Sequence, residues 1–396
     1  MACFLWEARL FLSAFTIRRF SFTIDLVRIL HISSAKTYGG GEKHFVDLCR
    51  GLTTRGHDVF VALRPTNEWQ KRLNFLPPGN ILRVSLRNSF GVLSATRIAE
   101  FIRENNIEIV HAHVARDYIP ASLACRMAKN AEFVLTRHVL FPLKSVHRFT
   151  LTNLAKAIAV SKPVEANLQS VFTKEKVVLV SNGIDVEALE NADREKLRRA
   201  FRVEHNIPFD AFLIGTIGEL KVLKGQRDFI LAANIVAQKH PEARFIIVGK
   251  DNSFNQDFRR ELKRLVKIFR MEEKFTWLEW TEDTASLLAA LDVFVSASHT
   301  ESFGLAILEA MAIGCAIVAT GTEGANELLQ TDVSGKLVPI KEPVRLAAAI
   351  GEFLDDQETR RRLGKNAQAR AREKFGLERM IGETEKLYKD ISTQKT

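Results

Sequence analysis

The sequence predicts an α/β protein made of two Rossmann-like, doubly wound domains that face each other across a cleft. Three observations lead to this fold class. The chain has 396 residues, which is enough for two domains. Short apolar runs alternate with helical patterns along most of it, and the alternation starts afresh near residue 211. Hydrophobic residues make up 46% of the chain and charged residues 26%, so both domains can bury an ordinary core.

The first alternation begins at Val27. After the first strand, a glycine turn at Gly39–Gly41 opens a helix that runs to Arg55, and a second helix is expected near Ser94–Asn105. Apolar strands separated by helices are typical of a parallel sheet that is covered on both faces. The strands expected in this half are Val27–Ser33, Asp58–Leu63, Ile107–His111, Glu132–Thr136, Ala157–Val160 and Lys176–Val180.

The second alternation follows a charged, weakly periodic segment, Asp185–Asp210. Its expected strands are Ala211–Thr216, Arg244–Val248, Phe275–Trp280, Val293–Ser296 and Ala316–Ala319, and its expected helices are Gly225–Lys239, Asn255–Phe269, Asp283–Leu291 and Gly304–Ile313. We therefore divide the chain into a first domain (27–190), a linker (191–210), a second domain (211–376) and a C-terminal helix (377–396) that returns to the first domain. Ligands of doubly wound sheets bind at the carboxyl ends of the strands, so the cleft between the domains is the expected site.

Residues 1–26 differ in composition from the rest of the chain. They are rich in phenylalanine interleaved with arginine, which fits an amphipathic segment at a membrane interface. They do not fit a signal peptide, because no clean apolar core and small-residue cleavage site follow the arginines. Since a strand begins at Val27, we favour the hypothesis that translation starts there and that residues 1–26 are not native.

Positive charge is concentrated in the first half. Residues 1–200 contain 29 Lys and Arg against 18 Asp and Glu, whereas residues 201–396 contain 28 against 29. This excess suggests an anionic partner, such as a phospholipid surface or a lipid-phosphate acceptor, although a basic surface that only aids solubility explains it equally well. A nucleic acid is disfavoured, because no recognition helix or aromatic–basic platform is visible. No apolar run reaches the ~18 residues of a membrane span, and the four cysteines lack C-x-x-C spacing, so we predict a cytoplasmic protein, peripheral at the inner face of the membrane.

The most informative stretch is Ser298–Ala312. Glu301 follows a buried strand, and Glu309 lies eight residues on, about two turns into the next helix. The turn between them places three backbone N–H groups at the helix N-terminus, where they can hold a phosphate. These groups belong to Phe303, Gly304 and Leu305. Carboxylates on both sides of an anion site suit a nucleotide sugar, although a capped helix with an incidental glutamate explains this spacing better when it is taken alone.

Further motifs occur in order along residues 27–390. They are Tyr38–His44, Ile109–His113, Val160–Lys162, Val180–Asp185, Gly215–Leu220 followed by Lys224 and Gly225, Ile247–Gly249, and Glu323 and Gly324 with Glu327. Several are weak alone, but the ordered set is specific. With the Glu-x7-Glu block, the chain resembles the retaining GT-B glycosyltransferases of glycosyltransferase family 4, group 1.

The resemblance implies the GT-B fold and a retaining transfer of a hexose-type sugar from a nucleotide-diphosphate sugar, with a UDP-sugar favoured. It implies that Glu309 binds the donor ribose and that Glu301 contacts sugar hydroxyls. Lys224, the three N–H groups and the turn at Gly218 would hold the diphosphate, and His113 would contact the transferred sugar. A lysine and a helix N-terminus can stabilise the leaving group without a metal, which agrees with the lack of an Asp-x-Asp pair. We therefore expect no metal and no cofactor.

One position departs from the family pattern. Glu219 stands where the family usually has an arginine that adds a second positive charge for the phosphates, and an acid facing a diphosphate is unfavourable. Either Glu219 points elsewhere and another base replaces the arginine, for which Arg137 and His138 are candidates, or donor binding is atypical. Gly40 and Gly41 are expected to let the backbone approach the donor phosphate or the acceptor closely.

His111 and His113 end one strand, and alternation puts their side chains on the same face of the sheet. Two histidines at this spacing suggest a metal. No third ligand with suitable spacing follows in the sequence, so we predict no metal site. A histidine at a strand end is as often a structural hydrogen-bonding group.

The expected acceptor is an envelope glycan or a lipid-linked glycan of lipopolysaccharide or exopolysaccharide biosynthesis. This expectation depends on a dense run of basic residues, which are Arg126, Lys129, Arg137, Lys144, Arg148, Lys156 and Lys162. Two alternatives remain open: a nucleotide-sugar 2-epimerase of the same architecture, and a non-catalytic nucleotide-sugar binder if Glu219 disables turnover. A nicotinamide-dependent dehydrogenase is disfavoured, because the glycine turns do not spell G-x-G-x-x-G.

Overall fold

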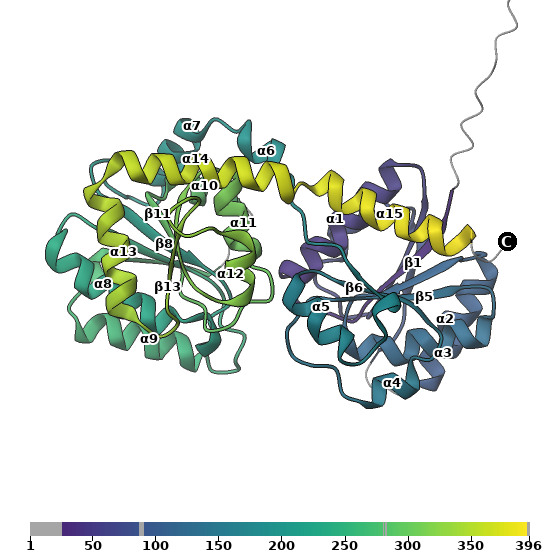
Figure 1. The fold of residues 1–396 in the computed structure, drawn as a ribbon. Coiled ribbons are helices and arrows are strands. Elements are labelled where there is room, and N and C mark those ends of the chain that lie inside the picture. Colours follow the sequence, from purple (N-terminus) through teal and green to yellow (C-terminus); the bar gives the residue numbers. More distant parts are fainter. Residues whose placement is uncertain (1–25, 87–90, 280, 282, 394–396) are drawn as a thin grey trace, which may run out of the picture.

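A computed structural model of the chain contains two parallel β-sheets, each covered by helices on both faces (Figure 1). The structure describes residues 26–86, 91–279, 281 and 283–393. The hypotheses about residues 1–26 therefore fall almost wholly outside the described residues, as do the last three residues of the predicted C-terminal helix. The predicted fold class, two Rossmann-like doubly wound domains, is confirmed.

The sheet of the first domain has seven strands in the order β3-β2-β1-β4-β5-β6-β7, and every neighbouring pair is parallel. The strand order reverses between β1 and β4, which is where doubly wound sheets bind ligands. In this register His31 lies beside His111. The strands are β1 (Arg28–Ser33), β2 (Asp58–Leu63), β3 (Ile81–Arg83), β4 (Ile109–Ala112), β5 (Glu132–Arg137), β6 (Leu154–Ala159) and β7 (Val177–Leu179).

Helices cover both faces of this sheet because each presents one apolar stripe to it. The core on one face includes α1 and the C-terminal helix α15, and the core on the other includes α2, α3 and α5. The helices are α1 (Gly40–Thr54), α2 (Val92–Glu104), α3 (Tyr118–Ala128), α4 (Val146–Thr150), α5 (Lys162–Gln169) and α15 (Leu377–Thr393). Short 3-10 turns lie at Gln70–Leu73, Pro78–Asn80, Ala115–Asp117 and Lys174–Lys176.

The sheet of the second domain has six parallel strands in the order β10-β9-β8-β11-β12-β13. They are β8 (Leu213–Ile217), β9 (Arg244–Val248), β10 (Phe275–Leu278), β11 (Val293–Ser296), β12 (Ala316–Thr320) and β13 (Lys336–Val338). The core on one face includes α8 (Gln226–Lys239), α9 (Asp257–Ile268) and α13 (Pro343–Asp355). The core on the other includes α10 (Thr284–Ala290), α11 (Leu305–Ala312), α12 (Glu323–Leu328) and α14 (Gln357–Lys374). Short 3-10 turns lie at Val222–Lys224 and Glu272–Lys274.

The prediction of a linker at 191–210 is wrong. This segment contains α7 (Arg194–Glu204), which packs on α10 and belongs to the second domain, and the short helix α6 (Val186–Glu190) precedes it. The many charged residues on α7 hide its apolar stripe in the sequence. Its core contacts come from Phe201 and from the fully buried Arg202, whose guanidinium donates to the Ala290 carbonyl and to the Asp292 carboxylate.

The chain crosses between the domains twice, and the two crossings lie side by side. Ile184 donates its N–H to the carbonyl of Phe375 at 3.1 Å, and Leu377 donates to the carbonyl of Ile184 at 2.8 Å. Helix α15 then lies against α1 of the first domain, as the yellow helix in Figure 1 shows. None of the helices within the described residues is long and apolar enough to cross a bilayer.

Candidate active site

The second domain contributes two carboxylates and a lysine to the junction between the domains. Glu301 follows β11, and Glu309 lies inside α11. The Nζ atom of Lys224 lies 2.6 Å from Glu301 Oε2. Gly304, just before α11, has φ of 99°, a left-handed conformation that favours glycine. This turn directs the first N–H groups of α11 out of the helix end, where an anion can accept them.

The first domain adds a cation to the same site. The Nζ atom of Lys43, in the first turn of α1, lies 3.9 Å from Glu309 Oε1 and 3.4 Å from Asp47 Oδ2. Burial raises the pKa of Glu309, and the Lys43 ammonium opposes this shift. Lys43 falls inside the glycine-rich motif used to predict the fold, but its role was not predicted. Its contact with Glu309 depends on how the two domains meet, which no local pattern specifies.

Gly40 lies at a close approach between the domains, and its approach to the donor phosphate or the acceptor stays a prediction. A Cβ atom on Gly40 would lie 2.8 Å from Leu305 Cδ1, so a side chain there would push against the start of α11. Next to it, Ser302 donates its hydroxyl to the carbonyl oxygen of His138 at 2.7 Å. Gly41 faces the ring of His138. Three of the four residues predicted for the first-domain loops therefore lie at the junction.

Arg137, the fourth of these residues, makes its hydrogen bond elsewhere. It is buried, and its guanidinium donates to the carbonyl of Phe141 in the loop that follows β5. This bond holds the loop to its own domain. Arg137 therefore adds no charge to the basic surface that the sequence suggested. Within the described residues, no contact of Arg137 supports its predicted role as the cation that replaces the missing arginine.

Glu219 is already paired. Its carboxylate lies 2.6 Å from Lys221 Nζ and accepts a hydrogen bond from Asn252 Nδ2 at 2.9 Å. These contacts favour the alternative in which Glu219 points away from the donor, because an acid that is paired with a lysine and hydrogen-bonded need not face a phosphate. The neighbouring Gly218 forms the turn after β8 and donates its N–H to the carbonyl of Val248.

Five histidines gather on the first-domain side of the junction. They are His31 in β1, His44 in α1, His111 in β4, His113 just after β4 and His138 just after β5. Burial lowers the pKa of His31 to about 3 and that of His44 to about 4. Burial, reinforced by the neighbouring histidines, also lowers the pKa values of the other three well below the usual value. The group is therefore neutral at physiological pH.

The prediction of no metal site relied on sequence spacing, which showed no third ligand for His111 and His113, and it stays a prediction. His31, His44 and His138 come from three other parts of the chain and place further imidazole nitrogens beside His113. Two sets of three histidines have donor atoms within 4.8 Å of one another. Sequence spacing could not reveal them, because parallel pairing of β1, β4 and β5 brings His31 and His138 to His113, and helix α1 brings His44.

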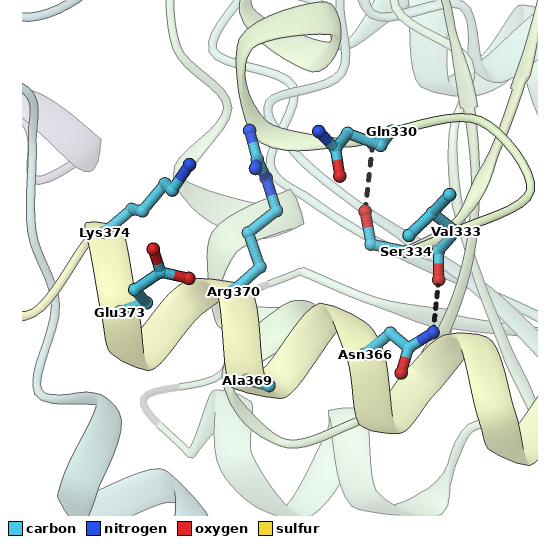
Figure 2. Close-up of a pocket in the computed structure, with 8 residues that line it drawn as sticks. All are labelled: Gln330, Val333, Ser334, Asn366, Ala369, Arg370, Glu373 and Lys374. Atoms are coloured by element: carbon cyan, nitrogen blue, oxygen red, sulfur yellow. Dashed lines mark hydrogen bonds between the residues drawn. The ribbon is translucent and has the colours of Figure 1, made fainter.

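A cavity of about 410 Å³ lies elsewhere, between α14 and the loop that contains Val333 (Figure 2). Two hydrogen bonds join residues of its lining: Asn366 Nδ2 donates to the carbonyl of Val333, and Gln330 N donates to Ser334 Oγ. Arg370 donates to the carbonyls of Glu327 and Leu328 at the end of α12. None of the predicted site residues lines this cavity, and its bonds fasten a loop to a helix.

Comparison with known proteins places both halves of the chain. The sequence profile described as Glycosyl transferases group 1 matches residues 198–370, and the profile described as Glycosyltransferase Family 4 matches residues 38–188. N-acetyl-alpha-D-glucosaminyl L-malate synthase of Bacillus anthracis is 26% identical over 383 residues, which cover 91% of this chain and 96% of that protein. The lipopolysaccharide core biosynthesis glycosyltransferase LpsD of Rhizobium meliloti (strain 1021) is 24% identical over 88% of this chain and 94% of its own length.

A solved structure supports the fold. HepE of Anabaena, crystallised in complex with UDP and glucose, superposes with a TM-score of 0.80 at 22% identity, over 91% of this chain and 99% of that one. With these matches, the protein is a glycosyltransferase of the GT-B architecture. More narrowly, it belongs to the group 1 glycosyltransferases of glycosyltransferase family 4. The predicted family and enzyme class are confirmed.

Proposed function

We propose that this enzyme moves a hexose-type sugar, with retention of its anomeric configuration, from a nucleotide-diphosphate sugar to an envelope glycan or a lipid-linked glycan. A UDP-sugar is the favoured donor, and HepE, which was crystallised with UDP and glucose, supports this choice. The observation that carries the proposal is the arrangement of Glu301, Glu309 and Lys224 around the start of α11, with Lys43 completing it from the first domain.

Each group has a distinct part in donor binding. Glu309 is buried and accepts hydrogen bonds from the ribose hydroxyls, while Lys43 offsets its charge. Lys224 is paired with Glu301 at 2.6 Å, so an arriving diphosphate competes for the ammonium. When Lys224 turns to the phosphate, Glu301 becomes free to accept a hydrogen bond from a sugar hydroxyl. Donor binding therefore exchanges an internal ion pair for two contacts with the substrate.

The proposed transfer step is the one that the family resemblance implies. The bond between the sugar C1 and the diphosphate oxygen breaks, and the acceptor oxygen forms a new bond to C1 from the same face, which retains the configuration. The acceptor proton passes to the departing phosphate oxygen. Lys224 and the N–H groups of Phe303, Gly304 and Leu305 stabilise the charge that develops on the diphosphate, without a metal or a cofactor. His113 contacts the transferred sugar.

Release of nucleoside diphosphate tests the donor and the reaction together. Wild-type protein and Glu309→Ala are incubated with a panel of nucleotide sugars and no added metal. Slow release from one donor, lost in the variant, supports the transferase and names the donor. Saturable binding with no release in the presence of a glycan acceptor would favour the non-catalytic binder, and a 2-epimer product with no free diphosphate would favour the epimerase.

The acceptor side is proposed to meet an anionic membrane, at the inner face of the cytoplasmic membrane. Four apolar side chains between β5 and the end of α4 are strongly exposed: Val139, Phe141, Val146 and Phe149. Phe149 is 75% exposed and Phe141 is 66% exposed. The exposed Lys144 and Arg148 lie among them. Exposed aromatic rings with flanking cations favour the interface of an anionic bilayer.

Vesicle co-sedimentation tests this acceptor hypothesis separately from catalysis. Wild-type protein should pellet with vesicles that contain phosphatidylglycerol and much less with pure phosphatidylcholine. Phe141→Ser combined with Phe149→Ser should remove most of this binding, whereas Phe209→Ser, which changes an exposed phenylalanine of the second domain, should not. Equal binding to both vesicles, or none to either, would count against a membrane acceptor and leave the donor reaction unaffected.

A further inference from the structure

The histidine group on the first-domain side contains buried nitrogen atoms that the fold leaves without partners. Three of them are His44 Nδ1, His113 Nδ1 and His138 Nε2, and none of these has a hydrogen-bond partner within the described parts of the chain. The same three histidines offer donor atoms within 4.8 Å of one another. Buried polar atoms are normally paired, so three unpaired nitrogens at one place indicate a ligand that bonds to all of them.

We propose that His44, His113 and His138 form a binding site for a divalent transition-metal ion, with Zn²⁺ the best-suited ion. Imidazole nitrogen suits zinc and its neighbours in the periodic table, and three histidines with a fourth open position are an established zinc ligand set. A zinc–nitrogen bond is about 2.0–2.1 Å long, so ligand nitrogens around one ion lie roughly 3.4 Å apart. One donor atom from each of the three histidines lies within 4.8 Å of the others, so shifts of roughly 1.4 Å or less would bring these atoms to that spacing.

A second set, His31, His111 and His113, is less suitable because His111 has no nitrogen to spare. Its Nδ1 is bonded to the hydroxyl of Tyr388 from α15, and its Nε2 is bonded to Thr136 Oγ1 at 2.7 Å. A metal at this set would have to displace one of these bonds. His44, His113 and His138 each keep an unpaired nitrogen and need no such exchange.

His31 contacts the ring nitrogen of His113 that the metal does not use. His31 Nδ1 lies 3.0 Å from His113 Nε2, and both rings are buried. If His113 donates its Nε2 proton to His31, its Nδ1 is left with a lone pair that can bind a metal. Metal-ligating histidines usually donate their other ring N–H to a hydrogen-bond acceptor, which fixes the tautomer and the ring orientation, and here the acceptor would be the imidazole of His31. His31 is therefore the positioning residue of the site.

The site is separate from the Lys224–Glu301 pair, which lies on the second domain. It shares His113 with the proposed transfer reaction. Zn²⁺ and the transferred sugar therefore compete for His113, and Zn²⁺ inhibits transfer. This inhibition rests on the proposed function.

Direct metal binding tests the site without any assay of transfer. Full-length protein without a histidine tag is treated with a chelator, desalted and titrated with Co²⁺, which reports nitrogen coordination by its visible absorption. Zn²⁺ is then used to displace the Co²⁺, and bound metal is counted by elemental analysis after dialysis. The variants are His138→Ala and His44→Gln in the site, His31→Asn behind it, and His299→Ala in the second domain as the control. Circular dichroism checks that each variant is folded.

One equivalent of metal is expected in wild type and in His299→Ala. Binding should be lost in His138→Ala and His44→Gln, and it should weaken by about 10–100-fold in His31→Asn. A wild-type protein that binds no stoichiometric Co²⁺ or Zn²⁺ overturns the proposal, as does full binding by either folded site variant. Failure here leaves donor release untouched, so it is distinguishable from failure of the proposed transferase function.

Discussion

The two sides of the domain junction hold their polar groups in different ways. The first-domain side holds five neutral histidines, four of them buried and His138 partly buried, and their hydrogen bonds join them to one another or to uncharged groups. The second-domain side uses ion pairs, such as Lys224 with Glu301 and Lys221 with Glu219. The difference indicates a division of labour. In the proposed reaction, the charges that meet the diphosphate lie on the second domain, whereas the first domain contributes Lys43 and the uncharged groups that meet the sugar.

The largest expected effect concerns an ion pair in the body of the second domain. Arg202 is fully buried, donates to the carbonyls of Ala290 and Ala211, and pairs with Asp292 at 2.8 Å. Arg202→Met removes these donors and leaves Asp292 with Arg198 and the Leu213 N–H as its partners. We expect a loss of about 3 kcal/mol in the free energy of unfolding, because breaking a buried pair strands its partner. Urea denaturation measures it.

The control for this change lies on the same helix. Arg199 is exposed, so Arg199→Met should change the free energy of unfolding by less than about 0.5 kcal/mol. Equal losses in the two variants would show that α7 is stabilised by its charge as a whole. They would then remove the reason for placing α7 in the second domain's core.

Lys224 gives the next largest effect, now on turnover. Lys224→Ala removes the ammonium that is expected to stabilise the leaving diphosphate and leaves Glu301 unpaired. We expect kcat to fall by ~100-fold or more, the usual loss for one stabilising donor. Lys221→Ala is the matched control, because Lys221 is exposed and pairs with Glu219; its loss should stay below about tenfold. If Lys221→Ala were equally damaging, Lys221 would be the cation that replaces the family arginine.

Local sequence predicted the elements of regular pattern well. The bounds expected for Asp58–Leu63, Arg244–Val248 and Val293–Ser296 agree with β2, β9 and β11 residue by residue, because each is a compact apolar run. The three-residue strands β3 and β13 were missed, whereas the equally short β7 was found because it lies in a longer apolar run, Val177–Val180. Helix α3 was missed because its sequence, Tyr118–Ala128, is apolar on nearly every face.

The sequence predicted the candidate site only where its residues belong to a single motif. Glu301 and Glu309 come from a single strand–helix unit, so their spacing along the chain reveals their proximity. The histidine group does not: His31 and His113 are 82 residues apart, and Tyr388 reaches His111 from 277 residues away. Such contacts depend on strand order and on the return of α15, which spacing in the sequence does not encode.

Acid should distinguish the two sides by its effect on stability. His31 and His44 have folded-state pKa values of about 3 and about 4, below the ordinary 6.5, because burial disfavours their charged forms. The unfolded chain therefore binds more protons between about pH 6.5 and pH 4, and stability falls as the pH falls through this range. Each of these histidines should lower the free energy of unfolding by about 2 kcal/mol between pH 7 and pH 5.

Urea denaturation of wild type and His44→Asn at pH 7 and pH 5 checks this sign and size. The variant should be less sensitive to the change of pH by about the contribution of one histidine, whatever its stability at pH 7. An identical pH dependence in the two proteins would contradict burial of a neutral His44. It would also weaken the contrast between a neutral first-domain side and a charged second-domain side.

The smallest expected effect is at the point where the two sides touch. A Cβ atom on Gly40 would lie 2.8 Å from Leu305 Cδ1, the end of a flexible side chain. Gly40→Ala should therefore weaken donor binding by about 1 kcal/mol and raise KM about fivefold. Leu305→Ala should reverse this when the two changes are combined, since only the Leu305 backbone is expected to bind the donor. Gly79→Ala, with nothing within 4 Å of the added carbon, should have no effect. If the double variant stayed as impaired as Gly40→Ala, the glycine would serve direct approach to the substrate, and the first-domain loop would contact the donor itself.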